Sequence, residues 1–149
     1  MKKLITITLA AITLFGCVSQ KGADGKPGED GASGGFKILK EETYNGREKE
    51  SHVLITGQEQ LQMLYAELNI QDNTPVIDFN KKSVVAVFSG QKSSGGHSIT
   101  IKNVSVSKGI AHVKIKKTSP IAGQPASMAL TAPYCIAAIP KATTIEITE

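Results

Sequence analysis

Val84-Val85-Ala86-Val87-Phe88 is the stretch of this 149-residue sequence that decides its fold. Five consecutive apolar residues leave no polar face, which is typical of a strand that is buried on both sides. Tyr134 to Ile139 has the same character. The two segments therefore predict the central strands of a β-sheet.

A helix is predicted over about residues 57–68. Thr56 followed by Glu59 fits a capping box, in which two side chains accept hydrogen bonds from free backbone N–H groups at the helix start. Apolar residues then recur at helical spacing and form one stripe, which we expect to face the sheet. The stripe consists of Leu61, Leu64, Tyr65 and Leu68.

Alternating apolar residues and turn signals predict further strands around these elements. Asn45-Gly46 separates two of them and is a pair typical of hairpin turns. In another strand the apolar positions change parity after Ile101, so we expect a β-bulge near Lys102-Asn103. The expected segments are 36–44, 51–55, 97–106, 110–116, a short strand at 127–130, and 144–148, which closes the sheet. The predicted fold class is α+β, a mostly antiparallel β-sheet packed with one α-helix.

The N-terminus has the pattern of an export signal. Lys2 and Lys3 precede an apolar run from Leu4 to Phe15, which is too short to cross a bilayer because a spanning helix needs about 20 residues. Leu14 to Cys17 resembles the Leu-x-Gly/Ala-Cys lipobox of bacterial lipoproteins. The resemblance implies that residues 1–16 are a removable lipoprotein signal peptide and that Cys17 carries acyl chains such as palmitate. The protein is then expected in the cell membrane or outer membrane, lipid-anchored and facing the periplasm or the cell surface.

Residues 17–35 are interpreted as a Gly-rich tether and residues 36–149 as the domain. Glycines occur at positions 22, 25, 28, 31 and 34, a collagen-like period of three. A triple helix needs three chains and many more triplets. We therefore interpret the segment as a hydrophilic spacer between membrane and domain.

Composition excludes some classes of function. The formal charge of +4 falls to +2 once Lys2 and Lys3 leave with the signal, which is too little to indicate a nucleic-acid partner. The chain has no tryptophan and few aromatic residues, which weakens the case for glycan binding. With Cys17 acylated, Cys135 is the remaining cysteine, so no intramolecular disulfide is expected and a buried thiol is predicted.

The sequence contains no convincing catalytic or metal-binding pattern. His52, His97 and His112 are scattered and do not form a cluster with metal-ligand spacing. A Cys135–His97 thiolate–imidazole pair is the strongest catalytic arrangement, but an apolar strand raises the pKa of a thiol and lowers its nucleophilicity. We therefore predict a protein that is not an enzyme and that uses no catalytic residue, metal or cofactor.

Five segments occur in an order that resembles the C-terminal domain of the PrcB-like family of protease complex subunits. The resemblance runs from about Val53 to Lys141, and the chain departs from it at His97 and Cys135. It implies the same fold and a lipoprotein that associates with a surface protease and stabilises it. The segments are Val76–Phe79, Val84–Phe88, Gly90 with Ser94–Ile99, Thr131–Tyr134 and Ile139–Lys141.

The candidate partner-binding residues are Gly95, Gly96, His97, Pro133 and Tyr134. Glycines permit unusual backbone conformations, and loops on a rigid sheet are frequent binding surfaces, although a purely structural turn is the alternative for the two glycines. Residues 119–133 form a second candidate surface, because long loops in small domains are often functional. The leading hypothesis is a membrane-anchored lipoprotein that binds another protein, by resemblance a protease. The open alternative is a small-molecule or glycan-binding lipoprotein.

Overall fold

The computed structural model describes residues 35–149, so the predicted signal peptide, Cys17 and the tether up to residue 34 lie outside the described residues. The described chain contains seven strands and one helix, which confirms the α+β class. In chain order they are β1 (Lys37–Glu42), β2 (Glu50–Ile55), α1 (Gln58–Glu67), β3 (Lys82–Ser89), β4 (Ser98–Ser107), β5 (Ile110–Thr118), β6 (Tyr134–Pro140) and β7 (Thr144–Thr148).

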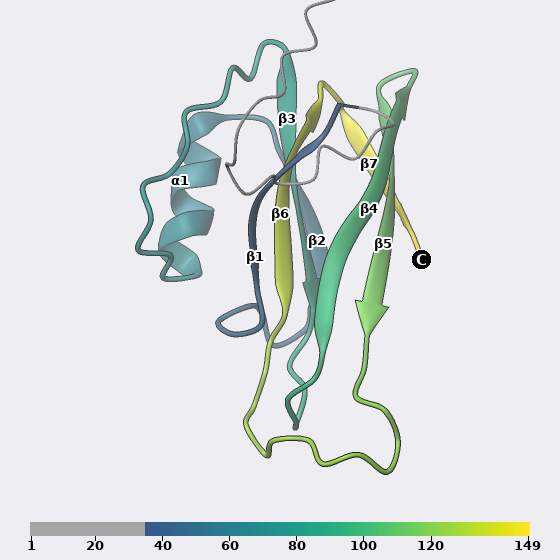
Figure 1. The fold of residues 1–149 in the computed structure, drawn as a ribbon. Helices are drawn as coiled ribbons and strands as arrows, with labels where there is room; N and C mark the ends of the chain where they lie inside the picture. The colour runs from purple at the N-terminus through teal and green to yellow at the C-terminus, as the bar shows by residue number, and fades with distance from the viewer. Residues whose placement is uncertain (1–34) are drawn as a thin grey trace, which may run out of the picture.

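The elements stack in three layers (Figure 1). The middle layer is an antiparallel sheet with strand order β1-β6-β3-β2, and α1 covers one of its faces. A second sheet, with order β4-β5-β7, covers the other face. The expectation of a single sheet was wrong. The reason is that β3 and β6 are apolar on both faces, while the helix covers only one face of their sheet. The amphipathic strands β4, β5 and β7 therefore form a separate sheet that covers the other face, instead of extending the first sheet.

Two cores result, one on each face of the middle sheet. Side chains of β3 and β6 alternate between them, as the period of a strand requires. Val85, Val87 and Ala137 pack against the second sheet, while Val84 and Phe88 pack against the helix. The predicted helical stripe is confirmed, since all four of its residues are buried in the second of these cores.

The pairing of strands confirms some predictions of detail. The ladder between β4 and β5 shifts register between Ile101 and Asn103, which is the predicted bulge. Strand β7 forms at the expected residues but runs parallel to β5. Residues 127–130 form no strand; an isolated bridge between Lys92 and Thr131 is the pairing observed there.

The hairpin suggested by Asn45-Gly46 was wrong. The chain does turn there, with Asn45 at a φ of 65°, but β1 pairs with β6 and β2 pairs with β3. The Gly46 N–H donates to the carbonyl oxygen of Ala132 at 2.9 Å instead of closing a hairpin. The two central strands lie between β1 and β2, because only those strands bury both faces.

The predicted capping box was also wrong. Gly57 is the N-cap of α1, with extended backbone and no side-chain cap hydrogen bond, so Thr56 lies one residue too early to cap. The Thr56 N–H donates to Gln60 Oε1 at 3.1 Å. The Gln58 side chain instead fastens the helix start to the following loop, through the Pro75 carbonyl oxygen and the Ile77 N–H.

The strands define two ends of the domain. The two candidate binding segments, residues 95–97 and 119–133, lie at the end where β3 and β5 finish, which is drawn lowest in Figure 1. Strand β1 begins at the opposite end. Among residues 35–149, no helix is long and apolar enough to cross a membrane.

Candidate partner-binding surface

The two segments singled out in the sequence lie side by side. The Gly95 N–H donates to the Ser127 carbonyl oxygen at 2.8 Å. Lys92 and Thr131 exchange two backbone hydrogen bonds, at 2.7 and 3.0 Å. The turn after β3 and the connection between β5 and β6 therefore form one surface.

The buried residue Thr131 links the two segments of this surface by a side-chain hydrogen bond. Its side chain is 1% exposed, and its Oγ1 donates to the Ser94 carbonyl oxygen at 2.8 Å. The next residue, Ala132, bonds through its N–H to the Thr43 carbonyl oxygen at 2.9 Å. Three chain connections are thus hydrogen-bonded to one another at this end of the domain.

The turn requires glycine at position 96, and Gly95 packs closely against Ser127. Gly96 has a φ of +83°, and a Cβ added there would lie 3.0 Å from Pro120 Cβ. A Cβ on Gly95 would lie 2.3 Å from Ser127 Oγ. These contacts give the glycines a structural role. His97 is half-buried beside them, with its Nε2 3.3 Å from Ser94 Oγ.

Pro133 and Tyr134 do not present their side chains to solvent. Tyr134 is 2% exposed and packs against Phe88 with ring centroids 6.2 Å apart, and burial raises the pKa of its hydroxyl. Pro133 is buried, and its carbonyl oxygen accepts the Ser89 N–H at 2.9 Å. Both residues therefore pack beneath the surface and are not part of its exposed face.

Three large apolar side chains are exposed on this surface. Ile121 is 67% exposed, Met128 is 90% exposed and Leu130 is 63% exposed. All three lie in residues 119–131, which we call the apolar loop. The sequence carries no charged residue from Thr118 to Pro140. Sequence reasoning picked out the loop but missed these three residues, although an uncharged run through a long connection was the signal that marks them.

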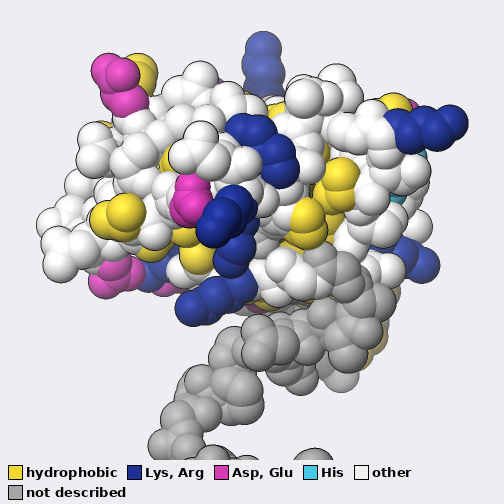
Figure 2. All heavy atoms as spheres, turned by 90° about the horizontal axis from the view of Figure 1, so that it is seen from above, with side chains coloured by type: hydrophobic (Ala, Val, Ile, Leu, Met, Phe, Trp, Pro, Cys, Tyr) yellow, Lys and Arg dark blue, Asp and Glu magenta, His cyan; other side chains and the backbone are white. Residues whose placement is uncertain are grey.

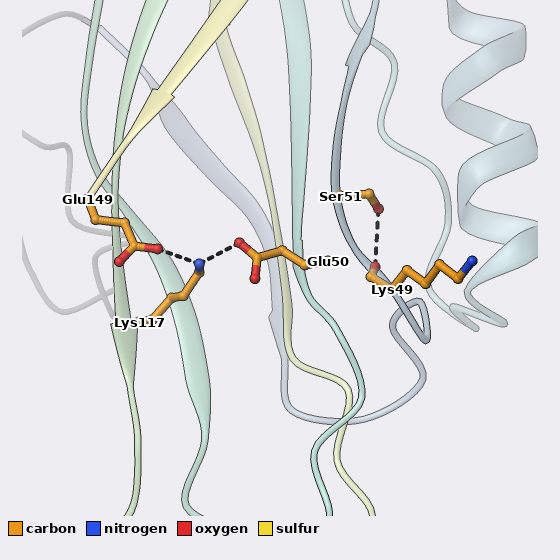
Figure 3. Close-up of polar contacts among 5 residues, drawn as sticks. All are labelled: Lys49, Glu50, Ser51, Lys117 and Glu149. Carbon is orange, nitrogen blue, oxygen red and sulfur yellow. Dashed lines mark hydrogen bonds and ion pairs between the residues drawn. The ribbon is translucent and has the colours of Figure 1, made fainter.

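A cluster of charges fixes the point at which the apolar loop leaves β5. Lys117 Nζ lies between Glu50 Oε1, at 2.5 Å, and the carboxylate of Glu149 (Figure 3). The hydrogen bond from Lys117 lowers the pKa of Glu50, and the bonds from Glu149 and Glu50 raise the pKa of Lys117. This contact joins the start of β2 to the end of β5 and to the C-terminal residue.

The thiol of Cys135 is in no position to act as a nucleophile. It is fully buried, and desolvation raises its pKa to about 12. The groups that perturb it are Glu41, Thr100 and the backbone of Ile101, while the imidazole of His97 contacts Ser94. Within the described residues, no group of three or more His, Cys, Asp or Glu side chains is arranged to hold a metal ion.

A hollow of about 380 Å³ opens between the two sheets and is one place that the small-molecule alternative could use. Glu50, Ser51 and His52 contribute its polar lining. The remaining lining is apolar and consists of Val87, Phe88, Ile99, Ile115 and Ile147. These are side chains of the inter-sheet core and of the strands that flank it.

Comparison with known proteins identifies a similarity to one family over part of the chain. Residues 83–140 match the family model described as PrcB C-terminal. No curated protein and no solved structure matches the chain. The match is narrower than the resemblance read from the sequence, because Val76–Phe79 lies outside it, but it includes the turn after β3 and the whole apolar loop. From Ser83 to Pro140, this protein is similar to the PrcB C-terminal domain.

Proposed function

We propose that this protein is a lipoprotein, anchored by acyl chains on Cys17 and facing away from the cytoplasm, that binds another protein through its apolar loop. It acts by binding and not by catalysis. The partner is a protease with which it forms a complex.

The exposure of Ile121, Met128 and Leu130 carries this proposal. Monomeric proteins rarely gather large exposed apolar side chains, and gathered ones mark interaction sites. Methionine is enriched in interfaces, and its flexible side chain adapts to a partner. Burying the exposed parts of these three side chains would contribute about 4 kcal/mol of favourable hydrophobic free energy, before the costs of association.

The loop is also held in place before any partner arrives. The Gly95–Ser127 bond fastens its middle and the Lys92–Thr131 pair fastens its end. A fastened loop loses less conformational entropy on binding than a free one, so more of the contact energy appears as affinity.

The choice of a protease as partner is supported by the similarity of residues 83–140 to the PrcB C-terminal domain. The resemblance read from the sequence implies an accessory subunit of a surface protease. The buried, protonated thiol of Cys135 is consistent with such an accessory role.

The experiment is affinity capture from solubilised envelope with cross-linking, using the chain from residue 17 onward. The double variant Met128→Ser/Leu130→Ser removes the exposed side chains, and we expect it to lose a protease that the wild-type chain retains. Val76→Ser/Met63→Ser is the matched control, because Val76 is 91% exposed and Met63 is 67% exposed outside the apolar loop. Equal capture by all three chains would refute the proposed surface.

A further inference from the structure

Lysines from four separate segments meet at the end of the domain opposite the apolar loop. Lys82, at the start of β3, lies opposite Pro140 in the β3–β6 ladder, and Lys37 lies opposite Ala138 in the β1–β6 ladder. The Lys141 N–H bonds to the Lys81 carbonyl oxygen at 3.2 Å. Lys108 belongs to the turn between β4 and β5, whose Gly109 accepts the Thr143 N–H at 2.8 Å. Figure 2 looks onto this end and shows Lys and Arg side chains spread across it.

Positive charge dominates this surface, which we call the basic end and which consists of Lys37, Lys81, Lys82, Lys108 and Lys141. All five residues are exposed. Acidic residues on or beside it include Asp78, with its Oδ2 3.8 Å from Lys81 Nζ, and Glu59 in the first turn of α1. Among the described residues, no ion pair neutralises the other four lysines, and Lys141 Nζ donates to a neutral group, the Phe79 carbonyl oxygen, at 2.6 Å.

The described chain also begins here. Gly35 leads directly into β1, whose first residue lies at the basic end. Seventeen residues, 18–34, separate Gly35 from the proposed lipid site at Cys17. A chain of that length spans at most about 60 Å. Attraction to a charged membrane acts only within about 8 Å at physiological salt, so the tether alone does not decide whether this surface meets the membrane.

We propose that the basic end docks on anionic phospholipid headgroups and orients the domain on the membrane. The proposal rests on the lipid anchor proposed above, because the anchor holds the basic end near the bilayer. Two observations indicate that the occupant is the lipid surface: the basic end is complementary in charge to anionic headgroups, and Gly35, which follows the tether, lies at this end. In this orientation the apolar loop points away from the membrane, where a protein partner has free access.

The test uses the chain from residue 17 onward carrying Cys17→Ser, so that no acyl chain contributes and failure of the anchor is measured separately by palmitate labelling of the wild type. We expect this chain to co-float with vesicles of phosphatidylglycerol and phosphatidylcholine, and not with phosphatidylcholine alone. Each lysine at an anionic surface contributes roughly fivefold to partitioning. The triple variant Lys81→Gln/Lys82→Gln/Lys108→Gln should therefore lower partitioning on the order of a hundredfold.

A matched triple variant separates location from net charge. Lys102→Gln/Lys114→Gln/Lys116→Gln removes the same charge from exposed positions on β4 and β5, and it should retain most of the binding. Equal losses in both variants, or no binding to the anionic vesicles, would overturn the proposal. It is also overturned if the basic-end variant loses protein capture while its vesicle binding is unchanged, because the surface then belongs to a protein partner.

Discussion

Replacing Gly96 by alanine should destabilise the domain by about 2 kcal/mol, and Gly123 provides a control with the same backbone. Both residues have a φ of +83°. A Cβ on Gly123 meets nothing within 4 Å, whereas a Cβ on Gly96 lies 3.0 Å from Pro120 Cβ. Positive φ costs an L-residue about 1 kcal/mol or somewhat more, and Gly123→Ala should show that cost alone. Gly96→Ala adds the displacement of Pro120, for which we allow about 1 kcal/mol more.

Thermal and urea unfolding measure the two variants. For a domain of this size, 1 kcal/mol corresponds to about 4 °C in Tm, so we expect losses of about 4 °C for Gly123→Ala and about 8 °C for Gly96→Ala. Partner capture on the same preparations then separates a structural glycine from a binding one. If the Tm of Gly96→Ala equals that of the wild type, the contact between the turn and the apolar loop is not as described. If it melts no lower than Gly123→Ala, the Pro120 contact carries no cost.

Three further predictions concern other parts of the chain. Cys17→Ser should abolish labelling with palmitate and release the protein from the membrane fraction; unchanged labelling would rule out Cys17 as the lipid site. Cys135 should react slowly with a thiol reagent at neutral pH and rapidly after denaturation, because burial raises its pKa to about 12. Since Lys117 lowers the pKa of Glu50, the contact stabilises the fold above the unfolded carboxyl pKa and is lost as pH falls through the folded one. Lys117→Gln should therefore lower Tm near pH 7 and converge with the wild type in acid, below the folded carboxyl pKa, and a difference in Tm that is constant with pH would contradict this.

Side-chain patterning predicted the elements because it reflects burial directly. The uninterrupted apolar run at 84–88 identified a strand covered on both faces, and the parity change after Ile101 located a bulge. Pairing partners were harder to predict, because Asn45-Gly46 reports a local turn and carries no information about β6, which lies about ninety residues later. The capping box was wrong because tertiary contacts, which a local pattern does not record, accompany the start of the helix. A shift of one residue in the helix start removes Thr56 from the cap, and tertiary bonds from Gln58 accompany that shift.

The candidate surface was located from the sequence, but its working side chains were not. Small residues at 95–96 and the long connection at 119–133 indicated two loops, which the fold brings together. Tyr134 was singled out as a binding residue, yet it is buried under the loops, because aromatic character does not distinguish an exposed ring from a core ring. Among residues 35–149 no helix or strand covers Met128 and Leu130, and the uncharged run from Thr118 to Pro140 was the sequence signal that their exposure left.

The pairing of β1 with β6 has a consequence for how the chain is made. Lys37 lies opposite Ala138, about a hundred residues later in the chain. A polypeptide synthesised from its N-terminus at roughly 5–20 residues per second leaves β1 without its partner for on the order of ten seconds. During that time neither edge of β1 is paired within its sheet, and an unpaired strand edge is a template for aggregation. A chain that terminates before β6 never covers it. Completion of β6 is therefore the step at which β1 first gains a hydrogen-bonded neighbour in the sheet.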